Sequence, residues 1–248
     1  MRFLCLPGGF GSAKALQTQL GPFCDSLQST GDVGFFFTQG QNEVHIAPEH
    51  EGFFGPPPNY TFALADQPES IRFNLADFPK RGSPEETMNR ALDLAGRPTF
   101  SNIREVVDRL IDILDTEGDI EGVIGYSEGA KIAASLIWEE SRRCKMSGAT
   151  PRLKCAIFIC GWPPIHPVSG RHVVADDIDD DEFITIPTFH VVGAADPFLD
   201  AAMALYNMCD PDSAELFDHG GGHIVPRGKQ TVDDLTGMVR DMIVSVSA

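Results

Sequence analysis

The chain has 248 residues, and 42% of them are hydrophobic, which is enough to bury one full core. Its 36 acidic and 19 basic side chains leave a formal net charge of -17, which disfavours binding to nucleic acid or to an anionic membrane surface. No apolar run approaches the ~18 residues of a membrane span, and the N-terminal run is too short for a signal peptide. We therefore expect one cytoplasmic domain over residues 1–248, with neither nucleic acid nor membrane as a partner.

The cysteines give no sign of a disulfide framework. They are scattered without Cys-x-x-Cys spacing, at Cys5, Cys24, Cys144, Cys155, Cys160 and Cys209. Three of them fall in expected strands, where buried reduced thiols are the simpler explanation. We expect neither disulfides nor a zinc site.

The first elements are expected to be a strand over Arg2–Leu6, a glycine-rich loop over Pro7–Ser12 and a helix over Ala13–Leu20. The loop matches neither phosphate-binding pattern, GxxxxGK before Ser or Thr, or GxGxxG. It does suit one half of an oxyanion hole, in which a backbone N–H after an early strand faces the reacting carbonyl. We assign this N–H to Gly9, with Phe10 as the alternative, and a simple turn is the non-catalytic explanation.

A short strand is expected over Asp32–Phe37, and a long irregular stretch follows it. From Thr38 to Pro84 the sequence has no sustained period, and loops of this length in compact domains tend to be functional. Aromatic side chains here and in the neighbouring motifs are candidates for an acyl pocket, although packing under the loop explains each equally well. These candidates are Phe10, Phe53, Phe54, Tyr60, Phe62 and Tyr126.

An amphipathic helix comes next, capped by Ser101 or Asn102 and ended by Gly118. Its apolar face is marked by residues at helical spacing, namely Ile103, Val106, Val107, Leu110, Ile111 and Leu114. We expect this helix to pack on a sheet and to carry no chemistry.

The motif around which the chain is organised is Gly125-x-Ser127-x-Gly129, between a β-branched run, Val123–Ile124, and a helical pattern. It is typical of a nucleophile elbow, in which a tight strand-to-helix turn exposes the serine hydroxyl above a sheet. The N–H of Glu128, directly after the serine, then supplies the second oxyanion donor. The alternative is a glycine-rich turn between two core elements.

Basic residues gather beyond the elbow helix, in a chain that is otherwise acidic. Cations at a helix C-terminus complement the helix dipole, which is one explanation for them. Docking of an acidic carrier domain is the other. The cluster consists of Arg142, Arg143, Lys145, Arg152 and Lys154.

The remaining elements alternate between strand and helix. Strands are expected over Lys154–Cys160, Thr188–Val192 and Ala214–Phe217, and helices over Phe198–Met208 and near the C-terminus. The proline-rich excursion over Gly161–Pro187 lacks the register of a calcium loop, so we expect an acidic, lid-like insertion there. Alternating strands and helices predict an α/β fold whose parallel sheet is reached by right-handed crossovers.

A reactive serine needs a base and an acid, which in this architecture follow it in the order Asp or Glu, then His. Asp196 comes directly after an expected strand and is preferred over Asp200, which falls in the first turn of a helix. His223 follows the last strand, and the glycines before it make a helix-borne metal pair with His219 improbable. We prefer His223 as the base and expect His219 to brace the loop.

These motifs together resemble the fungal FSH family of serine hydrolases. The likeness spans nearly the whole chain, and its most specific part is the closing HxGGHxVP. It implies an α/β-hydrolase fold with helices on both faces of a mostly parallel sheet, and it carries Ser127, Asp196 and His223 over as a catalytic triad. The stretches that carry the likeness are Leu6-Pro-Gly-Gly-Phe10, Gly125-Tyr-Ser-Glu-Gly-Ala130, Gly193-Ala-Ala-Asp196 and His219-Gly-Gly-Gly-His223-Ile-Val-Pro226.

Several members of that family act as free-standing thioesterases in polyketide biosynthesis. The resemblance therefore implies cleavage of an acyl thioester or ester, with a polyketide or fatty acyl chain on a carrier protein as the substrate class. Simple carboxylesters are the alternative, and sequence does not separate hydrolysis from cyclisation or acyl transfer. A non-catalytic binding protein on the same fold is the rival from another class. The chemistry requires no metal or redox cofactor.

Two positions depart from the pattern of the family. Pro7 stands where its first loop has a histidine, so the bracing that the imidazole gives that loop is lost or replaced. Glu128 stands where relatives often have glutamine. A carboxylate near a developing oxyanion opposes it unless the side chain points away or is protonated.

Overall fold

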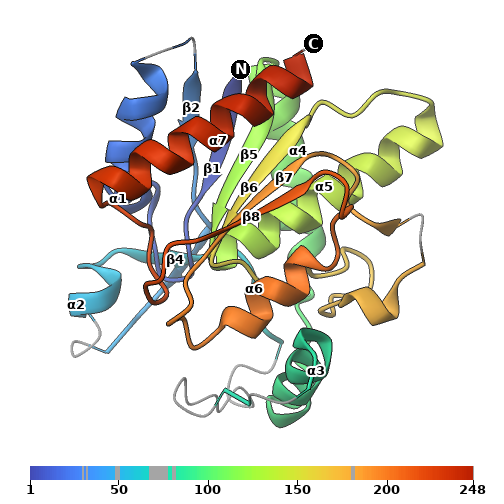
Figure 1. The fold of residues 1–248 in the computed structure, drawn as a ribbon. Coiled ribbons are helices and arrows are strands. Elements are labelled where there is room, and N and C mark those ends of the chain that lie inside the picture. The colour runs from blue at the N-terminus through green and yellow to red at the C-terminus, as the bar shows by residue number, and fades with distance from the viewer. Residues whose placement is uncertain are drawn as a thin grey trace.

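The computed structural model of the chain describes residues 1–29, 31, 33–47, 51–66, 78–79, 82–179 and 182–247. Its centre is a six-stranded parallel sheet in the order β2-β1-β5-β6-β7-β8 (Figure 1). All six strands therefore end at the same edge of the sheet. This confirms the α/β fold predicted from the sequence. The strands are β1 (Arg2–Leu6), β2 (Gly34–Phe37), β5 (Ile120–Tyr126), β6 (Cys155–Ile159), β7 (Thr188–Val192) and β8 (Ala214–Asp218).

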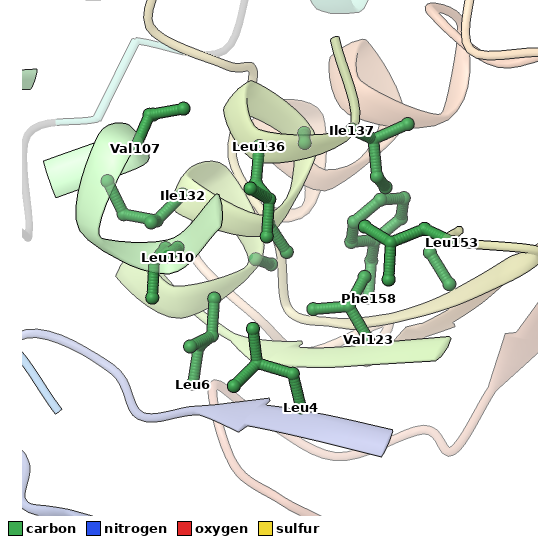
Figure 2. Close-up of a cluster of buried hydrophobic side chains, with 14 of the residues drawn as sticks. Leu4, Leu6, Val107, Leu110, Val123, Ile132, Leu136, Ile137, Leu153 and Phe158 are labelled. Carbon is green, nitrogen blue, oxygen red and sulfur yellow. The ribbon is translucent and has the colours of Figure 1, made fainter. Parts of the chain in front are cut away.

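Helices cover both faces of the sheet. α1 (Ala13–Gln28) and α7 (Lys229–Ser247) pack on one face, and α4 (Ile103–Glu117) and α5 (Glu128–Ser147) pack on the other (Figure 1). Successive side chains of β1 enter the two layers in turn. Figure 2 shows the layer under α4 and α5, where Leu4 and Leu6 face both helices. A strand buried on both faces reads as a continuous apolar run, which is why β1 was recognisable.

Helix α1 is longer than the sequence predicts, because it continues past Pro22 to Gln28 instead of ending at Leu20. A proline inside a helix removes one backbone hydrogen bond and costs about 3 kcal/mol. Phe23, Cys24 and Leu27 are nevertheless buried against the sheet. Burial of these side chains offsets the lost hydrogen bond, and this contribution comes from tertiary packing.

Three short elements lie in the described part of the stretch that was expected to be irregular. β3 (Asn42–Val44) and β4 (Asn59–Thr61) pair as an antiparallel sheet of their own, with α2 (Glu51–Phe54) between them. These elements have three or four residues each, too few to establish a period. Asp32, where we expected β2 to begin, lies outside the described residues.

Helix α3 (Pro84–Leu94) was not predicted, although a local sequence signal marks its start. Ser83 accepts a hydrogen bond from the Glu86 N–H, the Glu86 side chain accepts one from the Ser83 N–H, and Pro84 occupies the first turn. Ser-Pro-Glu-Glu is therefore a capping box. The helix packs against α6 (Leu199–Tyr206), which starts one residue later and ends two residues earlier than expected.

The residues before α4 do not cap it through their side chains, contrary to expectation. Asn102 occupies the N-cap position, but its amide accepts from the Leu64 N–H and donates to the Phe62 carbonyl. The Ser101 hydroxyl donates to Asp66. Both side chains thus hold the segment that follows β4, and the predicted end of α4 at Gly118 is confirmed by its left-handed φ of 67°.

The excursion between β6 and β7 packs against α3 and α6. Val174 and Trp162 join a cluster with Phe78 and Phe198, and the short 3-10 helix η4 (Ala175–Asp177) follows Val174. Residues 180–181 of its acidic run lie outside the described part, and a lid function stays a prediction. The six cysteines are free. Among the described residues, no helix has the length and apolarity needed to cross a membrane.

Helix and strand packing enclose the imidazole of His190, and its ionisation is therefore linked to folding. His190 in β7 is 1% exposed and lies between the rings of Phe158 and Tyr206, each with its centroid at 5.1 Å. Burial lowers the pKa of this imidazole from 6.5 to about 3, so the ring is neutral in the folded protein at neutral pH.

Because the unfolded chain gains this proton near pH 6.5 and the folded chain only near pH 3, acidification favours unfolding between those values. We expect this group to lower the free energy of unfolding by about 1.4 kcal/mol for each pH unit below 6.5. His190→Leu should remove this contribution. Urea denaturation from pH 6.5 to 5 measures it, and equal pH slopes in the two proteins would contradict the prediction.

Candidate active site

Ser127 lies on a strained turn between β5 and α5. Its φ of 52° and ψ of -114° fall outside the regions that a side chain favours. The turn closes tightly because a Cβ on Gly125 would lie 2.4 Å from Ala130 Cα, and one on Gly129 would lie 2.1 Å from the Leu6 carbonyl oxygen. Only glycine fits these two positions. The geometry is that of the predicted nucleophile elbow.

The three side chains selected from the sequence meet above the ends of β5, β7 and β8. His223 Nε2 lies 2.9 Å from Ser127 Oγ, and His223 Nδ1 lies 2.8 Å from Asp196 Oδ2. An ionised carboxylate only accepts hydrogen bonds, so Nδ1 donates to Asp196, and Nε2 is the nitrogen that faces the serine hydroxyl. The imidazole thus connects an alcohol to a carboxylate, the arrangement that activates a nucleophile.

Asp196 is 2% exposed, and the groups around it determine its charge. Burial acts to raise its pKa, but hydrogen bonds from His223, from the Phe198 N–H and from the Cys160 thiol lower the pKa overall. The carboxylate is therefore ionised at neutral pH. Asp200 lies in the first turn of α6, as expected, and the structure does not bring it to Ser127 in place of Asp196.

The loop that carries His223 is held from two sides. Tyr126 donates its hydroxyl hydrogen to the His223 carbonyl oxygen over 2.8 Å, and the ring of Phe198 meets the imidazole edge-on at 5.2 Å. His219 Nδ1 accepts from the Gly221 N–H at 3.2 Å, so this ring supports the glycine turn. Burial lowers the pKa of His219 and keeps the ring neutral.

The loop after β1 lies against the elbow. A Cβ on Gly8 would be 3.2 Å from Ser127 Cβ, and one on Gly9 would be 3.5 Å from Glu128 Oε2. Glu128 is the first residue of α5, where backbone N–H groups have no partner within the helix. The loop after β1 and the first turn of α5 therefore both lie beside the serine. An oxyanion hole requires backbone N–H groups from two such segments.

Residues that sequence reasoning did not select brace this loop where Pro7 replaces the expected histidine. Asn59 Nδ2 donates to the Phe10 carbonyl at 2.9 Å, and the Ala13 N–H donates to Gln39 Oε1 at 2.9 Å. Phe10 itself has a left-handed φ of 63°. Asn59 and Gln39 lie in the irregular stretch, where no local pattern marks them.

The candidate pocket aromatics separate into different environments. Phe10 is 37% exposed and its ring lies 4.8 Å from that of Phe54. Tyr60 and Tyr126 are half-buried, and Tyr126 uses its hydroxyl on the His223 loop. Phe62 is 1% exposed and packs in the hydrophobic core. The side chain of Phe53 lies outside the described part of the structure.

One group of side chains in the described residues has the composition of a metal site. The ligand atoms of Cys160, Asp196 and His223 lie within 4.8 Å of one another. Burial raises the pKa of the Cys160 thiol, so it keeps its proton, and Asp196 and His223 are bonded to each other. A thiol and two already paired groups suit a hydrogen-bonded array better than metal ligation.

The sequence matches the family described as Serine hydrolase (FSH1) over residues 1–235. It is 27% identical over 248 residues to the esterase FPY3 of Fusarium mangiferae, covering 98% of this chain and 97% of that protein. It is 26% identical over 267 residues to the esterase citA of Monascus ruber, covering 100% of this chain and 94% of that protein.

Similar solved structures are α/β-hydrolases. Zea mays acyl-protein thioesterase 2 gives a TM-score of 0.54 at 14% identity, covering 97% of this chain and 93% of that one. The RedJ thioesterase of the prodiginine pathway in Streptomyces coelicolor gives 0.50 at 15% identity, covering 97% and 85%. At these identities the likeness shows a shared fold.

The close approach at the elbow predicts the effect of a single methyl group. Gly129→Ala places a Cβ 2.1 Å from the Leu6 carbonyl oxygen, so the chain must separate β1 from α5. We expect a loss of about 3 kcal/mol in the free energy of unfolding together with loss of serine reactivity. Gly237→Ala is the matched control, because nothing lies within 4 Å of its Cβ in α7 and alanine favours a helix. Equal melting temperatures for the two variants would refute this reading of the elbow.

Proposed function

The chain belongs to the serine hydrolase (FSH1) family, and from that premise we propose that it cleaves acyl esters or thioesters with Ser127, His223 and Asp196 as a catalytic triad. The observation that carries the proposal is the hydrogen-bonded chain from the Ser127 hydroxyl through both nitrogens of His223 to Asp196. Relatives over the full length are named esterases, which supports the same reaction class.

In the proposed mechanism His223 Nε2 takes the proton of Ser127 as the serine oxygen attacks the acyl carbonyl carbon. The carbonyl oxygen becomes an oxyanion, which the N–H groups of Gly9 and Glu128 stabilise. Asp196 stabilises the imidazolium, and the imidazolium gives its proton to the departing thiolate or alkoxide. Water, deprotonated by His223, then attacks the acyl-enzyme, releases the carboxylic acid and restores the serine.

The substrate class that we propose is a polyketide or fatty acyl chain bound to a carrier protein as a thioester. Its support is the resemblance of the motifs to fungal FSH hydrolases and the exposed Phe10 beside Phe54, which offers apolar surface on the loop after β1. Simple carboxylesters are the second candidate, and release by cyclisation or transfer is a variant that product analysis distinguishes. Free, mostly buried cysteines support a cytoplasmic setting.

We expect a fluorophosphonate probe to label the wild-type chain and to leave Ser127→Ala unlabelled, because the probe reacts with an activated serine. His223→Ala and Asp196→Asn should lower kcat on an acyl thioester by about 10⁴. Asp200→Asn is the matched control, since this carboxylate lies only four residues away and should leave kcat within about twofold. A wild-type chain that neither reacts with the probe nor hydrolyses acyl esters or thioesters would favour a binding protein.

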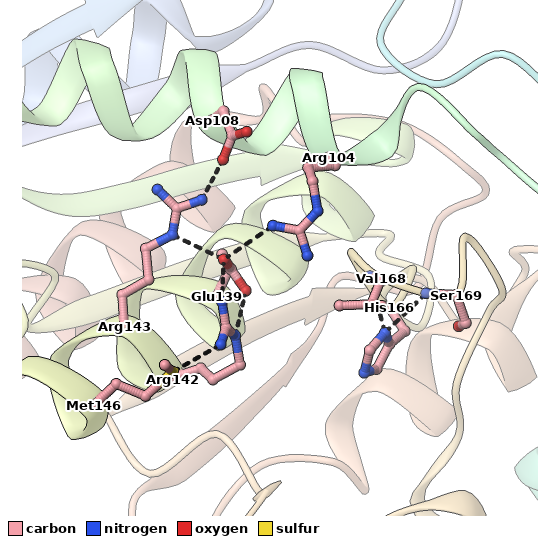
Figure 3. A network of polar contacts seen from close by, with 9 residues as sticks. All are labelled: Arg104, Asp108, Glu139, Arg142, Arg143, Met146, His166, Val168 and Ser169. Carbon is pink, nitrogen blue, oxygen red and sulfur yellow. Dashed lines mark hydrogen bonds and ion pairs between the residues drawn. The ribbon is translucent and has the colours of Figure 1, made fainter.

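The basic cluster bears on the proposed carrier partner. Figure 3 shows Arg104, Arg142 and Arg143 gathered around Glu139, with Arg143 also paired to Asp108. Burial acts to raise the pKa of Glu139, but the two guanidinium groups of Arg142 and Arg143 lower it to about 2. These arginines therefore have a structural task within the chain, although their side chains remain 47% and 37% exposed.

Charge reversal at Arg142 and Arg143 would leave the buried Glu139 beside like charges, so a milder substitution is the better test of docking. If the cluster binds an acidic carrier, Arg142→Gln should lower kcat/KM for carrier-bound acyl thioester several-fold and leave a free, small acyl thioester unaffected. Parallel kinetics on the two substrates measure this. Equal effects on both substrates would remove the docking hypothesis.

A further inference from the structure

The carboxylate of Glu128 is anchored to the end of β4. It accepts hydrogen bonds from the Thr61 hydroxyl at 2.6 Å and from the Ala63 N–H at 3.2 Å on one oxygen, and from the Phe62 N–H at 3.2 Å on the other. The side chain is 9% exposed. The anchor therefore fixes the carboxylate of Glu128 against the end of β4.

A second anchor joins the same strand to the other side of the elbow. Asn59, in β4, is 2% exposed and donates from Nδ2 to the Phe10 carbonyl at 2.9 Å and to the Gly55 carbonyl at 3.3 Å. The loop of Gly9 and the helix start at Glu128 carry the N–H groups proposed as oxyanion donors. Both segments are thus tied to one three-residue strand, although the chain separates them by more than a hundred residues.

The chemistry of the anchor requires a carboxylate. Thr61, Phe62 and Ala63 present hydrogen-bond donors to both oxygens of Glu128. A glutamine side chain places an oxygen where one carboxylate oxygen of Glu128 lies and an NH₂ group where the other lies. It can therefore accept from the Phe62 N–H or from the Ala63 N–H in that geometry, but not from both. Burial lowers the pKa of Lys131, one turn along α5, while the neighbouring Glu128 carboxylate acts to raise it, so the two groups attract each other.

We propose that Glu128 is a positioning residue, which fixes the oxyanion hole by locking β4 against the elbow through its carboxylate. The catalytic part of this inference rests on the proposed acyl hydrolase function, and the structural part does not. Oxyanion donors act only when they lie about 2.7–3.1 Å from the developing charge. A loosened β4 therefore weakens binding of the transition state more than binding of the substrate, and the effect falls on kcat.

We expect Glu128→Gln to lower kcat about tenfold with KM within about twofold, since removal of a whole oxyanion donor costs about 10²–10³. Glu140→Gln is the matched control. Glu140 lies three turns further along the same helix and is 7% exposed, and its carboxylate accepts from the N–H groups of Arg152 and Leu153 at 2.8 and 3.3 Å. The Glu140→Gln variant should lose about as much stability as Glu128→Gln and should keep the wild-type kcat.

Amide hydrogen exchange followed by NMR tests the anchor without any substrate. Glu128→Gln should speed exchange at one of the two amides of Phe62 and Ala63, Glu128→Ala should speed it at both, and Glu140→Gln at neither. Unchanged exchange at both amides in Glu128→Ala would overturn the structural part of the inference.

Kinetics test the catalytic part once the probe has labelled wild type. A wild-type or increased kcat in Glu128→Gln would overturn it, because the negative charge would then matter more than the position of β4. An equal fall of kcat in Glu140→Gln would also overturn it, because general loss of stability would explain both. Absence of probe labelling in wild type would instead contradict the proposed function, and amide exchange would still decide the anchor.

Discussion

The site depends on how closely the first turn of α5 approaches the end of β1. Gly129 leaves no space for a Cβ beside the Leu6 carbonyl, and this contact brings the loop after β1 over the elbow, where Gly8 lies against Ser127. Ser127 is thereby held at a positive φ, a conformation that costs about 1–3 kcal/mol and persists only where the surroundings enforce it. The position of the hydroxyl and that of the neighbouring N–H groups therefore have one cause.

The acid and base meet the serine because the sheet is parallel. β7 and β8 are neighbours that end at the same edge, so the loops carrying Asp196 and His223 emerge side by side. The Ala195 N–H donates to the Gly221 carbonyl and joins the two loops directly. A buried carboxylate is costly without hydrogen bonds, and Asp196 receives them from His223 and the Phe198 N–H.

The two departures from the pattern of the family are linked by β4. Pro7 stands in place of the histidine found in the first loop of the family. Asn59 holds this loop by donating a hydrogen bond to the Phe10 carbonyl. Glu128 introduces a carboxylate next to the serine, and donors at the end of β4 hold that carboxylate. A three-residue strand in a stretch without periodicity thus has contacts to both sides of the elbow.

The α/β fold, the turn at Ser127 and the meeting of Asp196 and His223 beside it could be predicted from the sequence, because strand ends, glycine spacing and helical period are local signals. The capping box at Ser83 is also a local signal, and it marks the start of the unpredicted helix α3. The tertiary structure alone decided the direction of the Glu128 carboxylate and the continuation of α1 past Pro22. Those outcomes depend on contacts between segments that are far apart in the chain. Such contacts produce no periodicity and no motif in either segment.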